Sequence, residues 1–264
     1  INSIGKNLDV KADRVINCEG FIIAPGFIDA HSHNDFFATD NDYTLPFLKQ
    51  GITTSIVGNC GFSAYGSNPK SQYNKDIGGG LFSTKNPGSL NDFSNAVKGK
   101  LIQNIVPLVG HGTTRIAVNG MSATALTIEQ KNNQLKLLED NLQQGAFGGS
   151  FGLMYEPGMY APYEELLEFA KLIKKYDGIL TVHPRANSKI ALGYPLLSRK
   201  PHLELGLDEV IKIMEATNVR IEYSHLIFVG KSSWKSVTPM INKLKKYNQL
   251  GYEIAYDIYP FTYG

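Results

Sequence analysis

The stretch Ala-Pro-Gly-Phe-Ile-Asp-Ala-His-Ser-His-Asn-Asp, residues 24–35, decides the fold of this sequence. It opens on a Pro-Gly turn, continues as a short apolar run and ends in two histidines, His31 and His33. The run predicts a buried strand over 27–33, on which residues two apart point the same way. Two adjacent imidazoles at the end of a buried strand are what a zinc-class ion takes from one element. The stretch therefore predicts a metal site, against the alternative of a polar strand end with two solvated histidines.

Outward from this stretch, apolar strand-like runs alternate with helical patterns, which indicates a parallel α/β architecture. Further strands are expected at 52–60, 105–110, 148–154, 179–183, 219–225 and 253–259. Helices are expected at 45–48, 90–97, 128–144, 162–176, 207–215 and 233–247. An open seven-strand barrel would expose an edge and part of its core. We therefore expect the sequence to be a fragment, with closure by another polypeptide as the alternative.

The remaining candidate ligands fall at the ends of predicted strands. Cys60 ends the second strand, His183 the fifth and His225 the sixth. Barrel enzymes carry their catalytic groups at the carboxyl ends of strands. A lone cysteine is more often a small buried hydrophobe, and a lone strand histidine is more often a core residue. Their common placement at strand ends reverses that preference and favours one metal site.

Composition is that of an ordinary globular chain. Its 264 residues are 42% hydrophobic and 19% charged, with a net charge of +2, so neither nucleic acid nor a membrane is an expected partner. Cys18 and Cys60 are too few for a disulfide framework, which makes a reducing, cytoplasmic compartment the default expectation. No secretory signal is visible, but Ile1 is not a natural start, so little follows from that.

The motif Pro-Gly-Phe-Ile-Asp-Ala-His-Ser-His, residues 25–33, resembles the first-strand motif of the amidohydrolase superfamily. Those proteins are metal-dependent hydrolases on a TIM-type (β/α) barrel. The resemblance implies an α/β fold in which residues 25–264 form such a barrel without its last strand. It also implies that the short β-like runs of residues 1–24 are a partial β-sandwich segment. The sequence would then be truncated at both ends.

Gly58-Asn59-Cys60-Gly61 narrows the resemblance to the N-acyl-D-amino-acid deacylase (D-aminoacylase) branch. In that branch a cysteine after the second strand ligates zinc in place of a carboxylated lysine. Two histidines that match His183 and His225 complete the tight zinc site, and the His-x-His pair binds a second, weaker metal. The resemblance therefore implies one tight zinc and a second weak position. The implied ligands are His31, His33, Cys60, His183 and His225.

Other matches suggest residues around the substrate. Tyr155 and Tyr259 match tyrosines that line the substrate pocket of the branch, and the resemblance implies catalytic and substrate-binding roles for both, with packing at the barrel rim as the alternative. The bidentate fork of Arg185 could meet a substrate carboxylate or pair with a structural acid. Asp29 could orient a ligand histidine or be an ordinary strand-end residue. His111 is not a ligand in the branch, so a supporting or structural role is expected.

Two departures from the branch pattern bear on function. The branch has Ser-His-His-Lys on the sixth strand, whereas here Ile227 stands in place of the lysine, which affects recognition of a substrate carboxylate. The catalytic aspartate of the superfamily ends the eighth strand, for which this sequence has no counterpart.

The expected activity is zinc-dependent hydrolysis of linear C–N amide bonds by metal-activated water, with N-acyl-D-amino acids as the favoured small-molecule substrates. Hydrolysis of cyclic amides, as in hydantoinases and dihydroorotases, is the first alternative. An inactive metal-binding fragment or degenerate barrel that lacks the aspartate is the second. Homo-oligomerisation is left open.

Overall fold

The computed structural model of the chain describes residues 3–6, 8, 11–80, 82 and 88–262. Within these residues, seven strands pair in parallel as one sheet, and their order in the sheet follows the chain. They are β1 (Phe27–Asp29), β2 (Ile52–Val57), β3 (Asn104–Gly110), β4 (Gly148–Gly152), β5 (Ile179–His183), β6 (Arg220–Tyr223) and β7 (Ile254–Tyr256). Because all pairs are parallel, every strand brings its carboxyl end to the same edge of the sheet.

Helices follow the strands and lie on the outer side of the sheet. The α-helices are α1 (Asn41–Lys49), α2 (Leu90–Val97), α3 (His111–Asn119), α4 (Ile128–Gln143), α5 (Tyr163–Lys175), α6 (His202–Thr217) and α7 (Val237–Gln249). Short 3₁₀ helices are η1 (Asn34–Phe37), η2 (Asn74–Asp76), η3 (Gly158–Tyr160) and η4 (Lys231–Ser236). No described helix is both long enough and apolar enough to span a bilayer.

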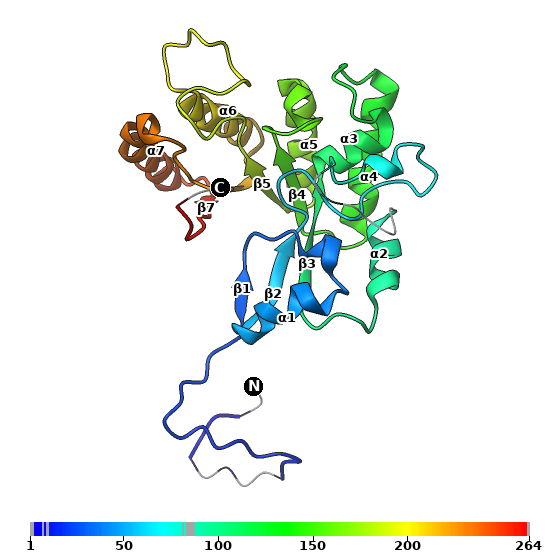
Figure 1. Cartoon of the computed structure of the whole chain (residues 1–264), viewed down its shortest axis with the longest axis vertical. Helices are drawn as coiled ribbons and strands as arrows, with labels where there is room; N and C mark the ends of the chain where they lie inside the picture. Colours follow the sequence, from blue (N-terminus) through cyan, green and yellow to red (C-terminus); the bar gives the residue numbers. More distant parts are fainter. Residues whose placement is uncertain (1–2, 7, 9–10, 81, 83–87, 263–264) are drawn as a thin grey trace.

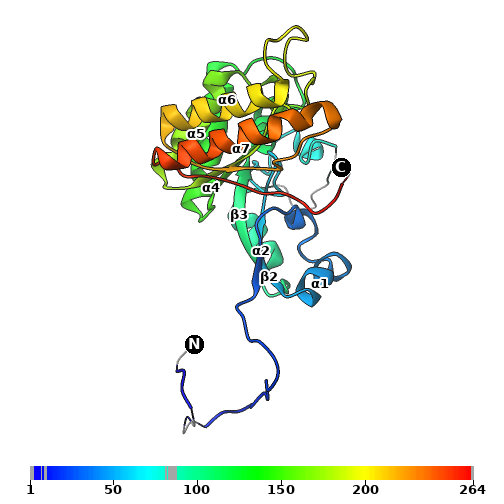
Figure 2. The ribbon, with the colours of Figure 1, turned by 90° about the vertical axis from the view of Figure 1, so that its left-hand side faces the viewer.

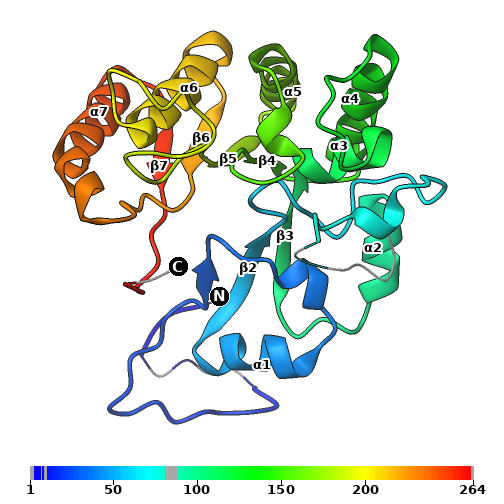
Figure 3. The same ribbon diagram turned by 45° about the horizontal axis from the view of Figure 1, so that its top comes forward.

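The sheet curls without closing within the described residues. Figures 1 and 3 show the strands along an arc with α3 to α7 outside it, and Figure 2 shows α5, α6 and α7 side by side on that outer surface. The prediction of an incomplete TIM-type (β/α) barrel is therefore confirmed.

Local sequence explains the regular elements. Ser89 and Asp92 form a capping box at the start of α2, in which each side chain accepts a hydrogen bond from the other residue's backbone N–H. In α5, Leu166, Phe169 and Ile173 recur at helical spacing and are completely buried. Both helices were predicted within one residue of their observed bounds.

The largest hydrophobic cluster lies between strands β4 to β7 and the helices that cover them. Phe151 and Leu180 from the sheet meet Phe169, Leu207 and Met214 from α5 and α6, and all five are at most 1% exposed. Burial of each such side chain contributes roughly 1.5–3 kcal/mol. This well-packed half of the sheet therefore holds the residues at its carboxyl edge in fixed positions.

Strand ends differ from the predictions. β1, β2 and β6 end two or three residues before His31, Cys60 and His225, so these side chains sit on the turns that leave the strands. The argument that His31 and His33 alternate along one strand is therefore wrong in detail. His33 instead takes the N-cap position of η1.

The segment 1–24 contains no strand among its described residues. Its apolar side chains, including Val15, Phe21 and Ile22, are exposed, and the segment runs away from the sheet (Figure 2). The strands predicted here are thus not formed in the described part of the chain. The division into a β-sandwich segment and a barrel at residues 24 and 25 remains a prediction.

Candidate metal centre

His31 is held in a defined orientation just beyond β1. Its backbone N–H donates to Asp29 Oδ1 at 3.1 Å, which forms a tight turn between the strand end and the histidine. The ring Nδ1 donates to Asp257 Oδ2 at 2.8 Å, and this contact directs the opposite nitrogen, Nε2, toward Cys60 Sγ at 3.3 Å. Asp29 was considered as a residue that orients a ligand histidine. It contacts the backbone of His31, whereas Asp257 holds the imidazole ring.

Cys60 lies on a sharp turn after β2 and is buried. Its φ of +52° is in the left-handed region, which is uncommon for a residue other than glycine. Asn59 supports the turn by donating to the Ile56 carbonyl, and Gly61 N–H donates to Ser150 Oγ on β4. A Cβ on Gly152 would lie 2.0 Å from the Cys60 carbonyl oxygen, so only glycine allows β4 to approach this closely.

His183 and His225 approach the same sulfur from the other side. His225 Nε2 lies 3.3 Å from Cys60 Sγ, and His183 Nδ1 lies 3.7 Å from it. His183 is the last residue of β5, whereas His225 follows β6 with a left-handed φ of +53°. His225 N–H donates to Asp257 Oδ1 at 2.8 Å, which holds this turn in place.

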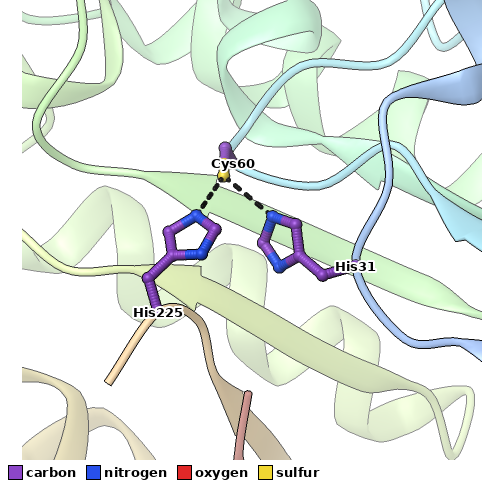
Figure 4. Close-up of side chains that lie close together, drawn as sticks. All are labelled: His31, Cys60 and His225. Carbon is purple, nitrogen blue, oxygen red and sulfur yellow. Dashed lines mark hydrogen bonds between the residues drawn. The ribbon is translucent and has the colours of Figure 1, made fainter. Parts of the chain in front are cut away.

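Figure 4 shows Cys60 with His31 and His225 converging on its sulfur. One donor atom from each of these three residues lies within 4.8 Å of the other two, which is a separation that a single ion can bridge. The structure therefore brings His31, Cys60 and His225 together, with His183 Nδ1 3.7 Å from the same sulfur, and the role of these residues as metal ligands stays a prediction. His33 lies at the edge of the cluster, with its ring centroid 5.7 Å from that of His31 and stacked on Phe82.

Burial favours the neutral form of His183 and His33. Desolvation, together with the neighbouring histidines, lowers the pKa of His183 from its usual 6.5 to about 3 and that of His33 to about 4. Neutral imidazole is the form that binds metals. Burial and the nearby Asp257 raise the pKa of the Cys60 thiol, so an ionised sulfur needs a cation beside it.

The two predicted tyrosines flank the cluster. The Tyr155 hydroxyl lies 3.3 Å from His183 Nδ1, and burial raises the pKa of this phenol well above its usual value. The Tyr259 ring is 5.8 Å from the His225 ring, centroid to centroid. Both side chains are half-buried and adjoin ligand candidates, so both remain candidates for substrate contact.

Arg185 is engaged by an acid of the protein. Its Nε and Nη2 donate to the two carboxylate oxygens of Glu209 at 3.0 and 2.9 Å, and Nη1 donates to the Met159 carbonyl. This is the structural-acid alternative considered from the sequence. Its role toward a substrate stays a prediction.

His111 belongs to a separate buried network. It donates from Nε2 to Glu165 Oε1 at 2.8 Å, and Arg115 Nε lies 3.8 Å from the same oxygen. Burial raises the pKa of Glu165, but its contacts with His111 and Arg115 outweigh this and hold it below its usual value. The network links α3 to α5, which is the structural role expected for His111.

Asp257 is the site residue that sequence reasoning missed. It directly follows β7 and contacts both His31 and His225. Burial raises its pKa, yet the hydrogen bonds from the two histidines hold that pKa well below its usual range. The strand-end rule did not select it, because the seventh strand was predicted at 253–259, which places Asp257 inside the strand, whereas the observed strand ends at Tyr256.

The pKa of His183 predicts a pH dependence for the metal-free chain. An unfolded histidine binds a proton near pH 6.5, whereas buried His183 does so only at about 3, so acid favours the unfolded state between these values. On going from pH 7 to pH 5, His183 should therefore lower the free energy of unfolding by up to about 2 kcal/mol. Urea unfolding of chelator-treated protein at both pH values measures this.

The matched variant for that measurement is His183→Gln, because other groups titrate in the same range. Burial raises the pKa of Asp35 to about 7, which acts in the opposite direction. We expect the variant to lose less stability than the wild type between pH 7 and pH 5. Equal losses in the two proteins would show that His183 is not held neutral.

Comparison with known proteins connects this geometry to one group of enzymes. Over 270 aligned positions, the chain is 27% identical to D-aminoacylase of Alcaligenes xylosoxydans xylosoxydans, covering 100% of this chain and 52% of the relative. It is 32% identical over 222 positions to N-acyl-D-aspartate deacylase of the same organism, covering 82% of this chain and 42% of the relative. The chain is a homologue of the D-aminoacylases. It spans about half the length of the curated relatives it matches.

Solved structures agree with this homology. N-acyl-D-glutamate deacylase from Bordetella bronchiseptica, complexed with zinc and a phosphonate inhibitor, matches with a TM-score of 0.76 and 28% identity over 90% of this chain and 48% of that one. L-hydantoinase from Arthrobacter aurescens is more distant, with a TM-score of 0.55 and 15% identity over 97% of this chain and 51% of that one, and shares the fold alone with this D-aminoacylase homologue. No protein-family model matches the chain.

Proposed function

We propose that the chain is part of a zinc-dependent hydrolase that cleaves the linear C–N amide bond of N-acyl-D-amino acids. The observation that carries the proposal is the convergence of His31, His183 and His225 on Cys60 Sγ at the carboxyl edge of the sheet. That edge is where barrel enzymes place their chemistry. Homology to D-aminoacylase and to deacylases of N-acyl-D-aspartate and N-acyl-D-glutamate supports the reaction class.

The donor set fits zinc. One thiol with neutral imidazoles is the nitrogen and sulfur combination that zinc accepts, whereas magnesium and calcium require oxygen ligands. His33 adds a buried Nδ1 for which the described residues offer no hydrogen-bond partner, as expected of a nitrogen kept for a ligand. We assign Cys60, His183 and His225 to the tight position, as the resemblance implies, and the His31–His33 pair to a second one.

When bound, zinc supplies a Lewis acid for the amide carbonyl and lowers the pKa of a coordinated water. The residues of the chain then provide the surroundings. Asp257 and Asp29 hold His31 in place, and the Tyr155 hydroxyl lies next to His183, where it can donate to an oxyanion. We propose Tyr259 as a second wall of the substrate site.

Recognition of the substrate carboxylate falls to groups other than a lysine at position 227. Ile227 has no charge, and the donors of Arg185 already contact Glu209 and Met159. We therefore propose that specificity depends more on the acyl group and the apolar side chain of the substrate than in relatives that carry the lysine.

The test is hydrolysis of paired N-acetyl-D- and N-acetyl-L-amino acids, beside a hydantoin, by the zinc-loaded and chelator-treated full-length hydrolase of which this chain is proposed to be part. We expect turnover of the D-isomers that is lost with chelator and restored by zinc. Turnover of the hydantoin alone would favour the cyclic-amide alternative. Zinc binding without hydrolysis of any substrate would favour the inactive metal-binding fragment.

A further inference from the structure

Asp257 contacts two of the converging histidines with one carboxylate. Oδ2 accepts the His31 Nδ1 hydrogen bond at 2.8 Å, and Oδ1 accepts the His225 backbone N–H at 2.8 Å. The same Oδ1 lies 3.4 Å from His225 Nδ1. The carboxylate is largely buried, with 14% of its side chain exposed, so water competes little for these contacts. It therefore joins the turn after β1 to the turn after β6, which are distant in sequence.

The rings of His31 and His225 have the same orientation relative to Asp257 and Cys60. In each ring Nδ1 is directed to the Asp257 carboxylate, and Nε2 lies 3.3 Å from Cys60 Sγ. A carboxylate beside Nδ1 keeps the proton on that nitrogen and leaves the Nε2 lone pair free. One acid thus lies beside the same nitrogen in two rings that come from different turns.

We propose that Asp257 is a positioning residue that fixes the tautomer and direction of both His31 and His225, so that their Nε2 atoms meet at Cys60. The proposal deepens the metal centre proposed above and rests on it for its purpose. The predicted tautomers and ring directions involve only side chains of the protein, so they can be tested on metal-free protein.

Neighbouring carboxylates do not duplicate this role. Asp29 accepts a hydrogen bond from the backbone N–H of His31, so it orients the main chain and does not constrain the imidazole ring. Glu222 on β6 is half-buried, and its burial, together with the nearby Asp257 charge, raises the pKa of its carboxyl. No hydrogen bond joins it to a described histidine. Glu222 is therefore a matched control, since it is a carboxylate of similar burial in the same region.

The experiment compares wild type with Asp257→Asn and Glu222→Gln. Asparagine keeps one oxygen that can accept from the His225 backbone N–H. Its NH₂ group takes the place of the oxygen that accepts from His31 Nδ1. Heteronuclear NMR of the imidazole nitrogens, on metal-free protein at mildly alkaline pH, should show His31 and His225 with the proton on Nδ1 in wild type and in Glu222→Gln. Asp257→Asn should shift His31 toward the other tautomer.

Zinc affinity gives the second measurement. We expect Asp257→Asn to weaken zinc binding about 10–100-fold, with Glu222→Gln unchanged. Wild-type rings protonated on Nε2, or wild-type affinity and tautomers in Asp257→Asn, would overturn the inference, and the wild-type spectrum decides even if the variant fails to fold. Tautomers that shift as expected in a chain that takes up no zinc would uphold the positioning role and refute the metal centre.

Discussion

Replacing Cys60 with alanine is expected to abolish tight zinc binding. The sulfur is the point at which nitrogens of His31, His225 and His183 meet, at 3.3, 3.3 and 3.7 Å. Loss of a residue that only supports a ligand costs about 10–100-fold in affinity, so loss of the central thiolate should exceed about 100-fold. Elemental analysis of the purified protein should find about one zinc per chain in wild type and none in the variant.

Two further variants separate ligand loss from other effects. Cys18→Ala removes the other cysteine, which lies in the segment before β1, and should keep the zinc. Cys60→Gly removes the thiol while relieving the left-handed backbone, where alanine costs roughly 1–2 kcal/mol. Cysteine and alanine share the Cβ that is strained at this φ, so only Cys60→Gly changes the backbone preference. Zinc retained in either Cys60 variant would refute the proposed site, because both variants lack the thiol.

Replacing Glu165 with glutamine is expected to destabilise the chain by about 3–5 kcal/mol, because it leaves buried Arg115 without its counter-ion. Arg115 and His111 are completely buried, and Glu165 is 3% exposed. A loss of this size corresponds to a fall in Tm on the order of 10 °C. Urea unfolding and thermal melting at neutral pH measure it.

The matched control is the exposed pair on α4. Lys136 Nζ and Asp140 Oδ2 are 3.0 Å apart in solvent, and Asp140→Asn should cost less than about 1 kcal/mol. A similarly small cost for Glu165→Gln would mean that the buried arginine finds compensation elsewhere, for example from the Thr124 and Pro157 carbonyls that it already contacts.

The sequence predicted best those elements whose local signals agree with their tertiary surroundings. β5 was predicted at its observed bounds, Ile179–His183, because its apolar and β-branched residues are bounded by a glycine and a proline. α2 was predicted near Leu90–Val97 and has those bounds, and its apolar face follows a capping serine. The barrel itself follows from the regular alternation of such segments.

α3 was missed for the opposite reason. It begins at His111 directly after β3 and includes glycine and two adjacent threonines, which have low helix propensity. Burial of the helix stabilises it instead, since its residues 111–117 are all buried. The short strands β1 and β7 were overestimated, since they were predicted at 27–33 and 253–259 but span Phe27–Asp29 and Ile254–Tyr256.

The candidate site was predicted as a set of residues but not as a set of contacts. Strand-end position selected His31, Cys60, His183 and His225, and the structure brings these four together. The pairing of His31 with Asp257 joins residues 226 positions apart, and no local pattern encodes such a contact. Arg185 shows the same limit, because only the folded chain reveals Glu209 beside it.

The left-handed turns at Cys60 and His225 have a consequence for the energetics of ion capture. Both residues already have the required backbone dihedrals, fixed by Asn59 and by the Asp257 carboxylate respectively. An incoming ion would therefore immobilise side-chain torsions and leave the main chain as it stands. Such preorganisation reduces the entropy lost on binding, and the free-energy cost of the strained backbone is already included in the free energy of folding. Loosening either turn should weaken capture even with every donor atom still present.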